Sequence, residues 1–226
     1  DGKAQVSVQY AFGVPERVDT IVISCQHDAD KDPDELRGEL RRLVIARACH
    51  DVRIDENTKI FINPSGRFVL GGFEADTGLT GRKLMVDTYG GLAPHGGGAL
   101  SGKDGTKVDR SGAYMARYVA KNIVAAGLAD VCTVSLAYAI GQAEPVAVEI
   151  DTQESGYYDD AFLTEAVRRV FDFTPAGMIR ALDLDKPFFT EVCNNGHFMH
   201  PQAAWEQTDK AEKLRMACAE LEDERT

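Results

Sequence analysis

The sequence predicts an α+β protein made of two units, on three observations. Runs in which apolar and polar residues alternate, as in half-buried strands, are interspersed with runs whose apolar residues recur every three or four positions, as in amphipathic helices. Glycine is unevenly spread, with 12 of the 21 glycines between Gly71 and Gly112. The length of 226 residues suits one large domain or two small ones. We therefore expect one unit in residues 1–70 and a second in 71–226, which begins with the glycine-rich segment.

The first unit is expected to contain strands at 4–10, 18–25, 59–63 and 67–70 and a helix from 32 to 44. The helix begins with an aspartate that can cap it and a proline suited to its first position, followed by a leucine stripe. The first strand alternates strictly, which predicts one buried face. That face consists of Ala4, Val6, Val8 and Tyr10. The order ββαββ predicts an antiparallel-leaning sheet with a helix on one face.

The second unit is expected to follow the order helix, strand, strand, helix, with a polar helical tail. Apolar residues recur at three- and four-residue spacing in the helices and at two-residue spacing in the strands. Gly127 is placed to end the first of these helices. In order, the elements lie at 116–124, 131–140, 146–150, 159–171 and from 208 onward.

Composition and charge argue against two classes of function. The net charge of −11 does not suit bulk binding of nucleic acid, which requires a basic surface. No apolar run approaches the length that spans a bilayer, so no membrane partner is expected.

Five cysteines, an odd number without a C-x-x-C pair, indicate reduced thiols in a cytoplasmic protein. Because the chain starts without methionine and almost directly with a strand, we expect further residues upstream of Asp1.

Residues 82–110 are locally cationic, with five basic against three acidic side chains. With their glycines they indicate a small anionic ligand, and the alternative is a long surface loop with solvated lysines. Gly97 to Lys103 fit the G-x-x-x-x-G-K pattern of P-loops, but no buried strand precedes them. Asp104 stands where Ser or Thr would bind Mg²⁺, and the helix starts late, so we reject the P-loop interpretation.

The same segment can hold a polyphosphate with side-chain cations and a metal ion instead. Lys103 and Lys107 lie four residues apart and can converge if the segment has begun to coil. Asp109, near the expected helix start, is interpreted from spacing alone as a helix cap in preference to an Mg²⁺ ligand. Upstream, the adjacent cations Arg82 and Lys83 suit a multiply charged oxyanion.

At these residues the sequence resembles the S-adenosylmethionine synthetases (methionine adenosyltransferases) of bacterial type. Long motifs carry the resemblance in one register along essentially the whole chain. They are "DGKAQV" at 1–6, "GRF" at 66–68, "DTGLTGRK" at 76–83, "VDTYGG" at 86–91, "HGGGALSGKD" at 95–104, "TKVDRS" at 106–111, "YVAKNIVAAGLA" at 118–129, "GHF" at 196–198 and "WEQTDKA" at 205–211.

The resemblance implies three βαββ-type domains around a pseudo-threefold axis. This chain would hold the remainder of the middle domain at 1–70 and the C-terminal domain at 71–226. The family makes S-adenosylmethionine from ATP and L-methionine, and the displaced triphosphate is cleaved to diphosphate and phosphate. The implied ions are two Mg²⁺ and K⁺. The implied assembly is a homo-oligomer, a dimer or homotetramer, with active sites between subunits, that serves one-carbon metabolism.

Carried over motif by motif, the resemblance implies twelve site residues. Those expected at ATP are Asp1, Gly2, Lys3, Arg67, Phe68, Asp76, Arg82, Lys83, Ala99 and Lys103. Those expected at methionine are Asp76 and Lys107, and Asp109 is expected at Mg²⁺. Those expected to be catalytic are Lys3, Lys83 and Lys103. A thioether attacks without losing a proton, so the reaction needs alignment and stabilisation of the leaving triphosphate rather than a general base.

The front of the family pattern is missing from the sequence. Family members begin with a further segment that includes a His-Pro-Asp motif and supplies other ligands. We therefore expect the 226 residues alone to be inactive, to expose an unfilled domain interface and to need this N-terminal segment. The alternative is a non-catalytic nucleotide-binding or regulatory subunit of the same fold.

Five further residues invite an interpretation. His197 and His200 could pair on a metal ion, but a packing and hydrogen-bonding role is preferred because nothing completes such a site. Trp205 is expected to be a buried anchor. Leu100 and Gly105 depart from residues that the family prefers, and we expect a larger pocket beside the nucleotide and a looser lysine loop.

Overall fold

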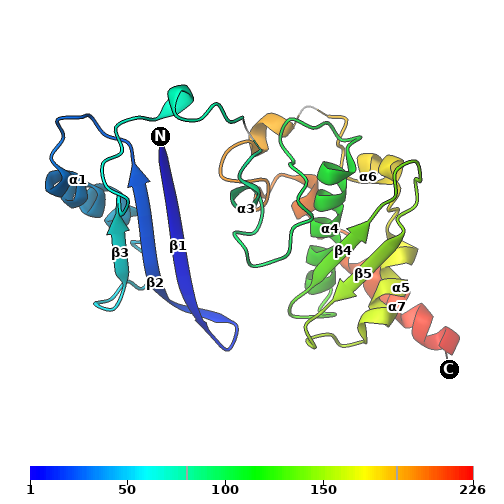
Figure 1. Cartoon of the computed structure of the whole chain (residues 1–226). Coiled ribbons are helices and arrows are strands. Elements are labelled where there is room, and N and C mark those ends of the chain that lie inside the picture. Colours follow the sequence, from blue (N-terminus) through cyan, green and yellow to red (C-terminus); the bar gives the residue numbers. More distant parts are fainter. Residues whose placement is uncertain (80, 187, 226) are drawn as a thin grey trace. The chain divides into compact units, whose positions relative to one another are not determined.

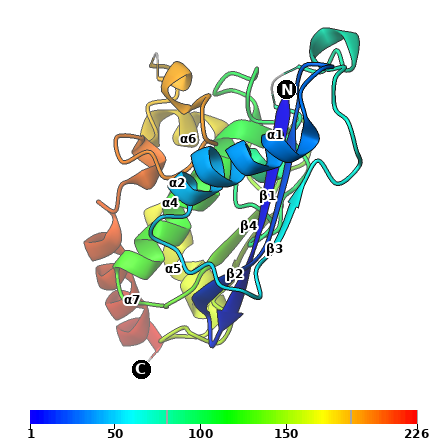
Figure 2. The same cartoon turned by 90° about the vertical axis from the view of Figure 1, so that its left-hand side faces the viewer.

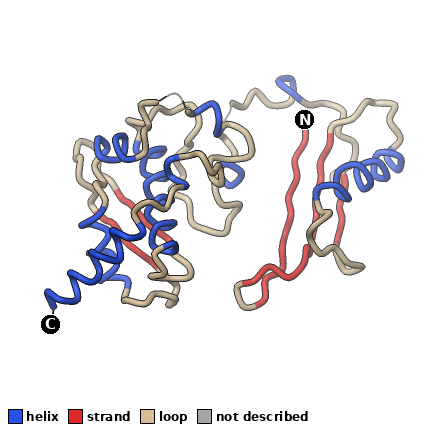
Figure 3. The backbone as a smooth tube through the Cα atoms, turned by 180° about the vertical axis from the view of Figure 1, so that it is seen from behind, coloured by secondary structure: helices blue, strands red, loops and turns tan. Residues whose placement is uncertain are grey.

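The computed structural model describes residues 1–79, 81–186 and 188–225. The chain forms two compact units, Asp1–Gly78 and Leu79–Thr226, each with its own sheet and helices (Figure 1). Figure 3 distinguishes the helices and strands within each unit by colour. The predicted α+β class is confirmed. Among the described residues, no helix is long and apolar enough to cross a bilayer.

The first unit contains a three-stranded sheet in the order β1–β2–β3. β1 (Gly2–Ala11) runs antiparallel to β2 (Val14–Cys25), and β3 (Lys59–Ile62) runs parallel to β2. The antiparallel-leaning sheet is thus only partly correct, because a helical crossover between β2 and β3 returns the chain in the same direction. The strand expected at 67–70 is wrong, since these residues are outside the sheet.

A continuous helical segment covers one face of this sheet (Figure 2). It comprises α1 (Pro33–Leu40), a π-helical turn (Arg41–Ile45) and α2 (Ala46–Ala48). Asp32 caps α1 as expected, because its carboxylate accepts two first-turn amides at 2.9 Å. The core beneath the helix consists of Val18, Ile21, Ile23, Ile45 and Ile62.

The buried face expected for β1 is wrong. Val6 and Tyr10 remain 50% and 48% exposed. Val6 stands opposite the buried Ile21 of β2, but the helix covers only β2 and β3. The alternation therefore identified the apolar face of β1 correctly, but it carries no information on how far the covering layer extends.

The second unit packs helices against a two-stranded antiparallel sheet. Its central helix, α4 (Val108–Ala125), is apolar on its inner side, and Gly127 ends it as expected with a φ of 71°. The other elements are α3 (Leu84–Asp87), β4 (Thr133–Ala137), β5 (Ala147–Asp151), α5 (Asp160–Val170), α6 (Pro175–Ala181) and α7 (Ala211–Arg225). Each element expected in this unit is present, but α4 begins at Val108, well before the apolar pattern at 116–124, and the other ends are shifted by a few residues.

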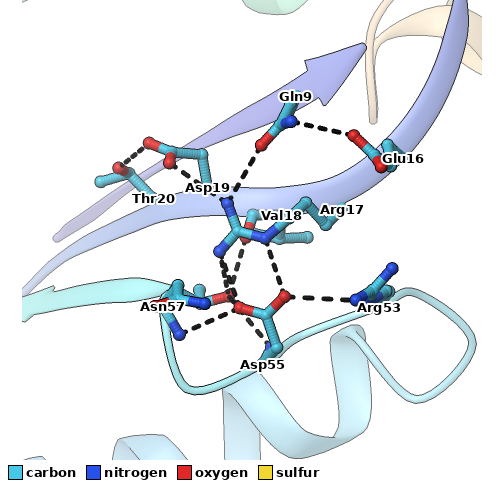
Figure 4. Close-up of polar contacts among 10 residues, drawn as sticks. Gln9, Glu16, Arg17, Val18, Asp19, Thr20, Arg53, Asp55 and Asn57 are labelled. Atoms are coloured by element: carbon cyan, nitrogen blue, oxygen red, sulfur yellow. Dashed lines mark hydrogen bonds and ion pairs between the residues drawn. The ribbon is translucent and has the colours of Figure 1, made fainter. Parts of the chain in front are cut away.

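An ion pair attaches the loop that precedes β3 to strand β2 (Figure 4). Arg17 donates through Nε and Nη2 to both carboxylate oxygens of Asp55 at 2.8 Å. The Thr58 hydroxyl donates to the Val18 carbonyl at 2.8 Å, so the same connection is held at a second point. The hydrogen bonds from Arg17 lower the pKa of Asp55 to about 2.

We predict that Asp55→Asn lowers the free energy of unfolding at neutral pH and that this difference shrinks on acidification. The pKa of Asp55 is lowered from 3.8 to about 2, so the carboxylate stabilises the fold fully above about pH 4 and progressively less as the pH falls toward 2. Urea unfolding followed by far-ultraviolet circular dichroism between pH 7 and pH 2 measures this difference.

Asp51→Asn is the matched control, because Asp51 lies in the same connection with a side chain that is 71% exposed. It should have little effect at any pH. A destabilisation by Asp55→Asn that is the same at every pH would contradict the prediction.

Candidate functional site

An ion pair marks the junction between the glycine-rich segment and α4. Lys103 Nζ donates to Asp109 Oδ2 at 2.7 Å, and the two side chains are 30% and 54% exposed. Lys107 occupies the cap position of α4 without a side-chain cap, while Asp109 lies in the first turn. The interpretation of Asp109 as the helix cap is therefore wrong, because its carboxylate bonds Lys103 instead.

Gly98 makes room for the Asp109 carboxylate. A Cβ at position 98 would lie 2.2 Å from Asp109 Oδ1, closer than atoms can approach, whereas one at Gly96 would meet nothing within 4 Å. Position 98 must therefore lack a side chain so that the first turn of α4 can pack against its backbone.

A second cationic loop lies against the first. A Cβ on Gly81 would lie 3.2 Å from the Ser101 carbonyl oxygen and 3.4 Å from the Ala99 Cβ, so the two backbones are in close contact. The exposed residues Arg82 and Lys83 follow directly, and Lys83 Nζ donates to the Arg82 carbonyl at 3.4 Å. The site residues that lie on these neighbouring segments of the second unit are Arg82, Lys83, Ala99, Lys103 and Asp109.

Lys107 does not share the environment of Lys103. Its Nζ contacts the Thr106 hydroxyl at 3.4 Å, whereas Lys103 bonds Asp109. The helix begins only at Val108, so the helical spacing that would have brought the two lysines together is absent.

The interpretation of His197 and Trp205 as packing residues is confirmed. His197 is 1% exposed, with Nδ1 2.6 Å from the Tyr114 hydroxyl and Nε2 2.9 Å from the Ser101 hydroxyl. Trp205, also 1% exposed, donates its indole N–H to the His197 carbonyl at 2.9 Å. Burial, and next the charge of Arg110, lower the pKa of His197.

Leu100 and Gly105 are both buried. Leu100 is fully buried in the core of the second unit. A Cβ at Gly105 would lie 2.7 Å from the Cβ of Leu184, so the lysine loop is in close contact with Leu184 at this point. A larger pocket beside the nucleotide and a looser lysine loop stay predictions.

In the first unit, the segment 67–72 lies beside the start of β1. Asp1 Oδ2 accepts the Gly72 N–H at 2.6 Å. Gln26 connects the two segments, because its N–H donates to the Asp1 carbonyl and its side-chain amide donates to the Val69 carbonyl, both at 3.0 Å. The expected ATP residues of both segments therefore adjoin within this unit. They are Asp1, Gly2, Lys3, Arg67 and Phe68.

His27 holds the Arg67–Phe68 pair in place, a role that sequence reasoning missed. Its ring Nε2 accepts the backbone N–H of Phe68 at 3.1 Å, and the backbone N–H of His27 donates to the Phe68 carbonyl at 2.9 Å. The Arg67 guanidinium bonds the Ala29 carbonyl. Asp76, further along the chain, accepts the Gly78 N–H at 2.9 Å.

Asp109 is a candidate ligand for the expected Mg²⁺. Among the described residues, no group of three or more His, Cys, Asp or Glu side chains could hold a metal ion by itself. Asp109 supplies an exposed carboxylate beside a cation, which suits Mg²⁺ that arrives with phosphate oxygens, since Mg²⁺ typically takes one or two carboxylates and completes its shell with phosphates and water.

Two family models match the chain. The model for the central domain of S-adenosylmethionine synthetase matches residues 1–68. The model for the C-terminal domain of S-adenosylmethionine synthetase matches residues 70–207. Both the anchored start of β1 and the junction of α4 with the glycine-rich segment fall within these matches.

We predict that Gly98→Ala loosens the junction between the glycine-rich segment and α4. The added methyl group displaces the Asp109 carboxylate and thereby breaks the Lys103–Asp109 pair. Amide hydrogen exchange across residues 98–111 should accelerate, as measured by mass spectrometry on the whole chain.

Gly96→Ala is the matched control, because its Cβ meets nothing within 4 Å and its φ is not positive. It should leave this exchange unchanged. Equal exchange in the two variants would show that the close approach at Gly98 has no structural consequence.

Proposed function

The chain belongs to the S-adenosylmethionine synthetase family, and on that premise we propose that it carries part of the site that transfers the adenosyl group of ATP to the sulfur of L-methionine. The observation that supports the proposal best is the gathering of Arg82, Lys83 and Lys103 on touching backbone segments of the second unit. Such a group of cations in an otherwise acidic chain suits a polyphosphate.

In the proposed reaction, a lone pair of the methionine sulfur forms a bond to C5′ of the ribose. The bond from C5′ to the bridging oxygen breaks, and its electrons leave with the triphosphate, which water then cleaves to diphosphate and phosphate. The sulfur attacks as a neutral thioether, so no side chain has to remove a proton. Catalysis must instead come from alignment and from stabilising the charge that collects on the leaving oxygens.

The cations of this chain supply that stabilisation. We assign Lys83 and Lys103 to the departing phosphates as catalytic residues. The guanidinium group of Arg82 donates hydrogen bonds to two phosphate oxygens in this scheme. We also assign Lys3 to the departing phosphates as a catalytic residue, and Lys107 to the polyphosphate or methionine. Fixed cations are effective here because they need no reorganisation when the charge develops.

The remaining expected residues bind the rest of the substrates. We assign Arg67 and Phe68 to adenosine, where their backbone is already anchored by His27. We assign Asp1, Gly2 and Ala99 to ATP, and Asp76 to ATP and methionine.

Asp109 is the residue of this chain that would hold Mg²⁺. Bound there, the ion would neutralise phosphate charge and make the triphosphate a better leaving group. Lys103 and Asp109 now neutralise each other at 2.7 Å, and a magnesium polyphosphate offers each of them a partner of opposite charge. The full complement of two Mg²⁺ and K⁺ would draw on further residues.

We further propose that the activity requires an N-terminal domain of the same family and a homo-oligomer, a dimer or tetramer, with sites between subunits. The two matching models describe only the central and C-terminal domains. The half-exposed apolar side chains of β1 support a covered sheet face in the assembled enzyme. Five unpaired thiols suit a reducing, cytoplasmic location.

We predict that Lys103→Met, in an enzyme complete with its N-terminal domain, lowers the rate of S-adenosylmethionine formation by about 10²–10³-fold, the usual loss when one charge-stabilising donor is removed. Product and triphosphate are quantified by chromatography. Lys186→Met is the control, because Lys186 pairs with Asp183 on the surface of the same unit and should retain full activity.

The same pair of variants tests the alternative, a non-catalytic nucleotide-binding or regulatory subunit. Such a subunit would give equal rates for Lys103→Met and Lys186→Met, because another chain would perform the reaction. Equal rates would also remove Lys103 from the catalytic residues.

A further inference from the structure

The second unit contains a buried chain of hydrogen bonds that ends on the glycine-rich segment at both ends. Arg110 Nη1 donates to the Lys103 carbonyl at 2.5 Å, and Arg110 Nε donates to the Tyr114 hydroxyl at 3.0 Å. Tyr114 is 2.6 Å from His197 Nδ1, and His197 Nε2 is 2.9 Å from the Ser101 hydroxyl. Because Ser101 and Lys103 belong to one loop, the chain of hydrogen bonds holds that loop at two points, the Ser101 hydroxyl and the Lys103 carbonyl.

The donors and acceptors assign the direction of these bonds. Arg110 can only donate, so the Tyr114 oxygen accepts from it and keeps its own hydrogen for His197 Nδ1. His197 Nδ1 is then an acceptor, and the ring proton resides on Nε2, where it is donated to Ser101. Each of these contacts then joins one donor to one acceptor, and a neutral imidazole fits the lowered pKa of His197.

Packing fixes the members in place. Arg110, Tyr114 and His197 are all buried, and the ring of Tyr114 stacks on Trp205 with centroids 3.7 Å apart. The Arg110 guanidinium lies 3.5 Å from the ring centroid of Phe189. Buried hydrogen bonds of this kind resist displacement, because breaking one leaves an unpaired group in a medium of low polarity.

The main chain of the same histidine reaches the second cationic loop. The His197 N–H donates to the carbonyl of Asp87, the last residue of α3, at 2.9 Å. α3 begins immediately after Lys83. His197 is thus bonded both to the segment that follows Arg82 and Lys83 and to the loop that carries Lys103.

We propose that Arg110, Tyr114 and His197 are positioning residues for the transfer reaction, which set the place of the Lys103 ammonium through the Lys103 carbonyl and the Ser101 side chain. This inference rests on the proposed role of Lys103. None of the three residues contacts substrate in this scheme. Their contribution is to remove freedom from a loop that glycines would otherwise leave mobile.

The test uses Tyr114→Phe in the complete enzyme, since this change removes only the hydroxyl and keeps the ring on Trp205. A displaced lysine should lower kcat by about 10- to 100-fold, as expected for a shift near 1 Å. Tyr118→Phe is the matched control: Tyr118 lies one turn further along α4, and its hydroxyl bonds Asp209, away from the loop. It should retain kcat.

A double-variant cycle separates positioning from general destabilisation. In the Lys103→Met background, Tyr114→Phe should change kcat by less than about twofold, because the group it positions is gone. The same fold loss of kcat in both backgrounds, or an unchanged kcat in Tyr114→Phe alone, would overturn the inference.

Two further measurements keep the test decisive. Hydrogen exchange of residues 97–104 should rise in Tyr114→Phe and not in Tyr118→Phe, and this result holds or fails even if Lys103→Met proves fully active and the proposed function falls. Ser101→Ala removes the other end of the chain of bonds without disturbing the core. It should lower kcat in the same direction, and full activity with unchanged exchange in Ser101→Ala would also refute the inference.

Discussion

The candidate site of the second unit depends on the hydrogen bonds of one buried imidazole. His197 bonds α4 through Tyr114, the glycine-rich segment through Ser101 and α3 through its own backbone. Loops rich in glycine have many accessible conformations, and ordering them opposes folding. The buried and hydrogen-bonded His197 restricts that freedom at a few points, so the backbone that carries the cations is held while their side chains stay at least partly exposed. Rigid support beneath solvent-facing charges is what electrostatic catalysis demands.

The charge distribution is arranged around the same junction. The chain as a whole is acidic, yet the segments that adjoin His197 carry adjacent cations. Before a ligand is bound, Lys103 and Asp109 lie in contact, so the loop does not hold an isolated ammonium group close to Arg82 and Lys83. The pair lies at the N-terminal end of an 18-residue helix, whose dipole favours anions there. Together these features suit the ligand that we propose, an anion that brings its own cation.

The sequence predicted the class of fold, the strands and helices of the second unit, and the caps at Asp32 and Gly127, because these depend on periodicity and on local turn chemistry. It did not predict the exposed face of β1 or the parallel pairing of β3, since both depend on where a helix lies in three dimensions. The candidate cations could be found from the sequence by their motifs. The supporting residues could not, with one partial exception: Arg110 and Tyr114 lie four apart on one helix, but only the structure shows that Arg110 is buried. Asp109 was misread as a cap because its partner, Lys103, is six residues away in an irregular loop.

The edge position of β1 has a consequence for how this chain behaves in isolation. Within the first unit, one side of β1 has no neighbouring strand, so a row of amide and carbonyl groups is open to another chain. Valine and tyrosine side chains line the same strand at half exposure, and such an edge templates intermolecular strand addition. We therefore expect β1 to limit the concentration at which the isolated chain stays monomeric, and Val8→Lys to raise that concentration without entering the core of the first unit.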